Sequence, residues 1–184
     1  MTDLSDADMT QLLQSVTETF DFDSQPLLLL KRKGEVLAKL YSRLGQQNQF
    51  IQFLAQETAQ PQEKRRQFAM YGFEIMSELH LTEEQMTSNK KDFQAIFQKM
   101  LNDESIQVRT SALKAITAFI SGIDNQDVVM EFEPILGLLI DTVSKALQTD
   151  EEQGTHALDS LGELTGAHPE VWKNTTVKLL DVVS

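Results

Sequence analysis

Apolar residues recur along this chain with the period of an α-helix, and this spacing constrains the fold more than any other feature. The clearest stripe spans residues 106–120 and consists of Val108, Ala112, Ala115, Ile116, Phe119 and Ile120. Ser105 offers a capping hydroxyl before this stripe, and Gly122 ends it. Because strand-like alternation is nearly absent, the pattern predicts an all-α fold.

A second apolar stripe precedes the first one and is separated from it by a short polar turn. Its members are Phe93, Ile96, Phe97, Met100 and Leu101. Two helices joined by so short a turn pack as an antiparallel hairpin. The unit recurs, with predicted pairs near 6–44, 47–80, 89–121 and 128–166 and an unpaired last helix over 170–183. The sequence therefore predicts about nine helices in a single solenoid segment over residues 1–184, with one unbroken helix over 128–148.

The second helices of these pairs recur at the interval of a known repeat class. Aligning their apolar stripes places Leu37, Met70, Leu113 and Leu158 at equivalent positions, which are 33, 43 and 45 residues apart. Helix pairs that repeat every 40–47 residues or so are typical of HEAT and armadillo proteins. One pair buries too little apolar surface alone, so stacking of pairs completes the core. The predicted architecture is an α-α superhelix of the HEAT/armadillo type.

The turn near residue 103 resembles the HEAT consensus. In that pattern an aspartate ends the turn between the two helices and a valine-arginine pair opens the second helix, and these residues are Asp103, Val108 and Arg109 here. We expect Val108 to enter the core and Arg109 to pair with turn carboxylates of its own or a neighbouring repeat. In other repeats the pair is replaced by Arg65-Arg66 and by Lys31-Arg32-Lys33.

From about Gln47 onward, the order of the pieces is similar to that of karyopherin-β nuclear transport receptors, and most of all to the importin-β3 (importin-5-like) branch. These pieces are a helix from Glu63 to Leu79, the repeat over 93–120, a first helix through Phe132 and Leu139, and the junction over 158–172. The resemblance implies a carrier that shuttles between cytoplasm and nucleus. It implies binding to protein cargo with localisation signals, to Ran-GTP and to the phenylalanine-glycine repeats of nucleoporins. In this family, nucleoporins contact mainly adjacent first helices, whereas cargo and Ran contact the second helices and their loops.

Acidic side chains on the second helices are the candidate partner-binding residues: Glu35, Glu74, Glu78, Asp159 and Glu163. Four of them form two pairs spaced four residues apart, so each pair shares a helix face and repels itself. A basic localisation signal, or a basic patch on a partner, would relieve that repulsion. A plainly solvated acidic face explains the same pattern, and both interpretations stay open at this point.

Composition and motifs argue against several other classes of function. The net charge of −12 repels nucleic acid, whose binding depends on basic side chains. The chain has no cysteine, its three histidines are scattered, and no nucleophile or phosphate-loop motif occurs. We therefore expect no catalytic, metal or cofactor-binding residues and no enzymatic activity. The longest apolar run, Leu27 to Leu30, is far too short for a membrane span, and the acidic start fits no signal peptide.

Two further expectations follow from the sequence. The alternative to a transport receptor is a HEAT scaffold subunit of another cytosolic or nuclear assembly, such as a phosphatase, translation or proteasome complex. The last predicted helix, which includes Trp172, has the apolar content of a first helix. No second helix follows it in the chain to cover these residues. We therefore expect both ends of the chain to be cuts within a longer protein, with the Trp172 helix available for end-to-end contacts.

Overall fold

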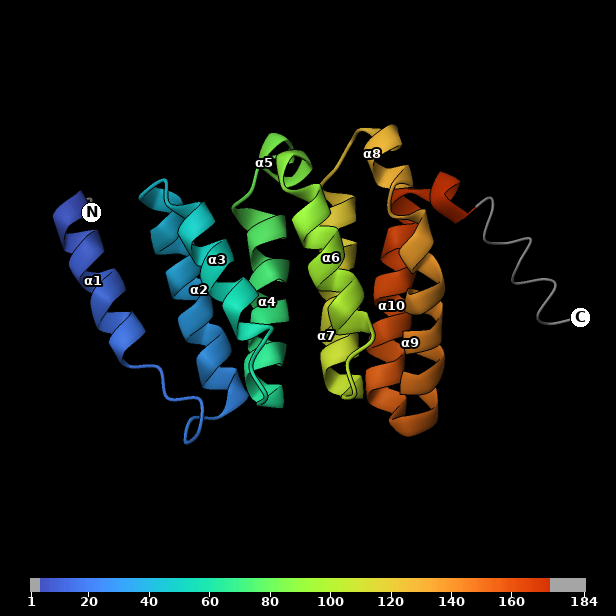
Figure 1. Cartoon of the computed structure of the whole chain (residues 1–184), viewed down its shortest axis with the longest axis horizontal. Coiled ribbons are helices and arrows are strands. Elements are labelled where there is room, and N and C mark those ends of the chain that lie inside the picture. The colour runs from blue at the N-terminus through green and yellow to red at the C-terminus, as the bar shows by residue number, and fades with distance from the viewer. Residues whose placement is uncertain (1–3, 173–184) are drawn as a thin grey trace, which may run out of the picture.

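A computed structural model describes residues 4–172 of the chain, and this part contains helices and no strand. Figure 1 shows them following one another along the long axis of an elongated molecule. The α-helices are α1 (Asp6–Glu18), α2 (Leu27–Arg43), α3 (Gln47–Glu57), α4 (Glu63–Leu79), α5 (Glu83–Ser88), α6 (Lys90–Leu101), α7 (Ile106–Ser121), α8 (Gln126–Met130), α9 (Leu136–Thr149) and α10 (Glu151–Ala167). Two short 3-10 helices are η1 (Glu133–Ile135) and η2 (Pro169–Trp172). The predicted all-α repeat fold is confirmed.

The long helices form antiparallel pairs, which are α1 with α2, α3 with α4, α6 with α7, and α9 with α10. The second helix of each pair packs on the second helix of the next, so α2, α4, α7 and α10 form one continuous row (Figure 1). The first helices form a second layer over this row. No helix of the described residues is both long and apolar enough to cross a membrane.

Side-chain caps fix where several helices begin. The Ser105 hydroxyl accepts the Val108 N–H at the start of α7, and Asp150 accepts the N–H groups of Glu152 and Gln153 at the start of α10. Each cap satisfies backbone donors that have no partner inside the helix. The helices therefore start where short polar side chains follow an apolar stripe.

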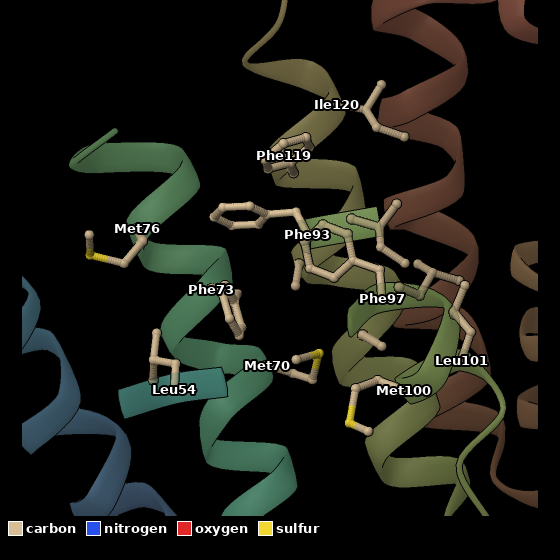
Figure 2. Packing of buried hydrophobic residues seen from close by; sticks show 14 of the residues in the cluster. Leu54, Met70, Phe73, Met76, Phe93, Phe97, Met100, Leu101, Phe119 and Ile120 are labelled. Atoms are coloured by element: carbon tan, nitrogen blue, oxygen red, sulfur yellow. The ribbon is translucent and has the colours of Figure 1, made fainter. Parts of the chain in front are cut away.

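The core lies between the two layers and is rich in phenylalanine. Figure 2 shows Phe73 of α4 beside Phe93 and Phe97 of α6, and ring centroids 5.3 and 6.0 Å from Phe73 place them in edge-on contact. Phe119 of α7 stacks on Phe93 at 4.7 Å. All the residues of the two predicted stripes are buried except Ile96, which is half-buried. Aromatic contacts of this kind add to the stabilisation from burial itself, so they tie neighbouring pairs together.

Two segments differ from the sequence prediction. The helix expected over 128–148 is divided into α8, η1 and α9, because Pro134 has no N–H to donate and the chain turns so that Phe132 is fully buried. The short helix α5 was not predicted. Its start carries a capping box in which Thr82 and Gln85 bond reciprocally, a signature that the sequence displays.

The predicted apolar stripe of α10, the second helix of the fourth pair, is wrong by one residue. Leu158 is half exposed, whereas Ala157 is fully buried against the neighbouring helices. Gly154 explains the tight packing here, because a Cβ on it would lie 2.6 Å from the Cα of Leu147 in α9. Of the helix predicted over 170–183, only the 3-10 turn ending at Trp172 lies within the described residues, and the rest lies outside them.

A buried ion pair joins the second repeat to the third. Arg66 of α4 donates to Asp103 in the turn between α6 and α7, with Nε–Oδ2 and Nη2–Oδ1 distances of 2.7 and 3.0 Å. The same guanidinium donates to the carbonyls of Gln60 and Pro61 at 3.1 and 2.6 Å. Both side chains are less than a tenth exposed. The pair therefore fixes the position of α7 against α4 from its N-terminal end.

We expect Asp103→Ala to destabilise the fold by about 3 kcal/mol, because it leaves a buried guanidinium without its counter-charge. Chemical denaturation of the full chain measures this loss. Glu104→Ala is the matched control, since Glu104 is the next residue, lies 3.6 Å from Arg66 and is 89% exposed. Its loss should stay below about 0.5 kcal/mol. Equal losses in the two variants would show that the pair does not hold the repeats together.

Candidate partner-binding groove

A groove of about 530 Å³ crosses the row of second helices at α4, α7 and α10. Its walls carry acidic side chains, with Glu74 and Glu78 on α4 and Asp159 and Glu163 on α10. Figure 1 shows α7 between these two helices, and the contacts of α7 with both agree with this placement. Four of the five sequence-predicted acids thus line one depression.

The residues of α7 explain why the surface is hollowed at this place. Ala118, Ser121 and Gly122 line the floor of the groove and are all small. Thr117 beside them is buried, and its hydroxyl donates to the Ser160 carbonyl of α10 at 3.4 Å. Small side chains let α10 lie close to α7, so the longer acidic side chains of α4 and α10 rise on either side.

The carboxylates of the groove affect one another. Burial raises the pKa of Glu74 to about 6, with a further rise from Glu78 and a smaller one from Glu163 across the groove. Lys114 and Lys31 oppose this rise. Burial and then Glu163 raise the pKa of Glu78 as well. Negative charge is therefore concentrated here beyond what the walls of the groove can neutralise.

Sequence reasoning missed two basic residues of the groove, Lys114 of α7 and His156 of α10. The sequence alone does not place them together, because their neighbours in the groove come from other helices. Listing the exposed residues of each second helix at helical intervals would have found both. The residues that line the groove recur three or four positions apart.

Glu35, the fifth predicted acid, lies outside this groove. Its carboxylate accepts from Arg32 at 2.9 Å and from the Tyr71 hydroxyl in a short hydrogen bond. The bond from Tyr71 is the largest cause of a lowered pKa of Glu35, and the bond from Arg32 adds to it. The structure therefore places Glu35 in an intramolecular network, in which Arg32 and Tyr71 already bind its carboxylate.

The consensus residues of the third repeat have distinct surroundings. Val108 is fully buried, and Asp103 bonds Arg66 of the preceding repeat and the Ser105 N–H. Arg109 was expected to meet a turn carboxylate, but its nearest acid is Asp141 within α9, at 3.7 Å. Asp103 in its own turn binds Arg66, and Asp150 in the next turn caps α10.

A second groove, of about 490 Å³, lies in the other layer between α3 and α6. Ile51 and Ala55 of α3 face Phe93, Ala95 and Ile96 of α6, with polar residues around them. Trp172, the predicted end-contact residue, packs half-buried against the core at the end of η2. Among residues 4–172, no group of three or more acids and histidines is arranged to hold a metal ion.

Comparisons with known proteins agree with the helical repeat fold. The family model described as "IPO5-like, TPR repeats" matches residues 29–182. A probable importin-5 homolog of Dictyostelium discoideum is 23% identical over 105 residues, which cover 57% of this chain and 10% of that relative. The chain thus matches only about a tenth of the relative's length. No solved structure matches the chain.

The description of the matching family gives its repeats as TPR, whose period is about 34 residues. In this chain α7 begins at Ile106 and α10 at Glu151, which is an interval of 45 residues. That interval lies within the range of HEAT repeats. Both repeat classes are stacks of antiparallel helix pairs, so the two descriptions agree on the architecture.

The raised pKa of Glu74 makes stability depend on pH. Because its pKa of about 6 lies above the usual 4.5, the folded state loses stability as the pH rises from about 4.5 through 6. We expect Glu74→Gln to remove this loss and to stabilise the fold by about 1–2 kcal/mol above pH 7.

The gain should shrink between pH 6 and 4.5 and vanish below that range, as measured by denaturation at a series of pH values. The exposed Glu104→Gln is the control and should show no comparable gain at any pH. A gain from Glu74→Gln that is the same at pH 4 and pH 8 would contradict this assignment.

Proposed function

The chain belongs to the importin-5-like repeat family, and we propose that it acts as a segment of a nuclear transport receptor. In this proposal it binds protein cargo, Ran-GTP and phenylalanine-glycine nucleoporins, moves between cytoplasm and nucleus, and catalyses no reaction. The observation that carries the proposal is the acidic groove on the row of second helices. The similarity to a probable importin-5 homolog supports the same role.

The groove suits a cargo segment rich in lysine or arginine. Glu78, Asp159 and Glu163 are exposed, and Glu74 is half-buried beside them. Within the described residues, none of these four acids has a salt bridge shorter than 4 Å. Basic side chains laid in the groove would relieve the repulsion among these acids, which adds to the effect of burial on the pKa of Glu74. The carboxylates that repel one another across the groove would thus attract a basic ligand.

The groove between α3 and α6 suits nucleoporin repeats. Its apolar residues come from two adjacent first helices, and its volume of about 490 Å³ exceeds that of a single aromatic side chain. A phenylalanine ring inserted between Ile51 and Ile96 would be shielded from water on both sides. The polar side chains of Asn48, Gln52 and Asn89 around it would hydrogen-bond the backbone of such a repeat.

Ran-GTP binding is proposed for the whole receptor more than for this chain. The chain matches only a small part of its relative, and a large partner gains affinity from contacts on distant repeats. We therefore expect this chain alone to bind Ran-GTP weakly.

The cargo role is tested with a fluorescein-labelled peptide that carries a run of lysines and arginines, measured by anisotropy. We expect the double variant Glu74→Gln, Glu163→Gln to bind it about tenfold more weakly, because each exposed ion pair contributes roughly 1 kcal/mol or less. Binding should also weaken between about 20 and 300 mM salt.

The double variant Glu18→Gln, Glu104→Gln changes the net charge equally and lies outside the groove, so it is the matched control. A loss of equal size in the control would assign binding to overall charge and not to the groove.

The nucleoporin role is tested with a phenylalanine-glycine repeat peptide. Ala95→Glu puts a charge into the apolar groove at an exposed position, so we expect at least a severalfold loss of binding without unfolding. Gln98→Glu adds the same charge to an exposed position of α6 outside the groove, and this variant should bind as the unmodified chain does. Chemical-shift changes that avoid residues 51, 55, 95 and 96 would rule this groove out.

A further inference from the structure

The sign of the charge alternates from helix to helix across the groove. α4 contributes Glu74 and Glu78, α7 contributes Lys114, and α10 contributes Asp159 and Glu163 beside the imidazole of His156. The chain therefore presents negative, positive and negative rows side by side, and not a uniform acidic surface. A run of consecutive basic residues would place one of its charges against the lysine.

Lys114 keeps its charge available to a ligand. Among the described residues it has no salt bridge within 4 Å and no side-chain hydrogen bond, although it lies close enough to Glu74 to lower the pKa of that carboxyl. Lys114 lines the groove together with the small residues Ala118 and Ser121 of the same helix. Lys114 thus adds a positive charge to the groove from the helix that lies between α4 and α10.

The spacing of the three rows corresponds to a definite spacing in an extended ligand. Axes of packed helices lie roughly 8–10 Å apart. A ligand extended as a polyproline II helix rises about 3.1 Å per residue with three residues per turn, so its side chains three positions apart share a face. Neighbouring rows are therefore reached by ligand residues about three positions apart. We propose that the groove recognises an extended cationic segment in which an acidic residue stands three positions from a basic residue on either side, with Lys114 binding the central acid.

This inference rests on the proposed cargo role of the same groove and adds a rule of selectivity to it. The alternation continues beyond the groove to α2. There Lys31 lies 4.7 Å from the ring centroid of Tyr71, while the nearby Glu35 is already bound by Arg32 and Tyr71. A ligand long enough to reach α2 would meet a second positive row.

The test compares three labelled heptapeptides at about 20 mM salt, where surface charges are least screened. The first is Lys-Gly-Ser-Glu-Gly-Ser-Lys, and the second is its isomer Glu-Gly-Ser-Lys-Gly-Ser-Lys, which has the same composition and net charge. The third, Lys-Gly-Ser-Lys-Gly-Ser-Lys, is purely basic. We expect the first peptide to bind at least about threefold more tightly than its isomer, the size of effect that one partly exposed ion pair supports.

The variant Lys114→Gln should bind the two isomers equally and should bind the purely basic peptide more tightly than the unmodified chain does. Lys99→Gln, at an exposed position of α6 in the other layer, is the control and should keep the preference. If the purely basic peptide binds in the groove but the isomers bind equally to the unmodified chain, the selectivity rule is wrong and the cargo role stands. If no peptide binds, or if binding survives Glu74→Gln with Glu163→Gln, the cargo role of the groove fails and the rule fails with it.

Discussion

The contact between α4 and α7 is the constraint on which the rest of the structure depends. It joins the second and third pairs, and it is closed at one end by the buried pair of Arg66 and Asp103. Along its length the phenylalanines of α4, α6 and α7 pack on one another, as Figure 2 shows for Phe73, Phe93 and Phe119. A solenoid has no other core, so each such junction sets the position of everything beyond it.

The groove is a consequence of how the pairs are stacked. Once α7 is fixed against α4, its small residues on the exposed side leave a floor, and α10 packs closely enough to form the second wall. Acidic side chains that belong to helices far apart in sequence then share one depression. Burial, with added repulsion from Glu78 and Glu163, raises the pKa of Glu74, so the fold keeps this charge in the groove at a cost.

The helical fold could be predicted well because its signal is local. The period of the apolar residues, the caps and the glycine and proline breaks identify helices and their order without any long-range information. Where this prediction failed, the cause was a local break in a helix or the packing of helices against one another. Pro134 and the burial of Phe132 divide one helix, and close packing at Gly154 moves the buried stripe of α10 by one residue, which leaves Leu158 exposed.

The candidate site was predicted only in part, for a physical reason. The sequence shows that Glu74 and Glu78, and likewise Asp159 and Glu163, share a helix face, because that follows from the helix period alone. It does not show that these two faces meet across α7, that Lys114 lies between them, or that Glu35 is bound by Tyr71. By itself, then, the sequence determined the helical repeat fold and which acidic side chains share a helix face. Only the tertiary structure decided which faces meet, because that depends on the rotation and spacing of whole helices, which contacts such as that between Arg66 and Asp103 determine.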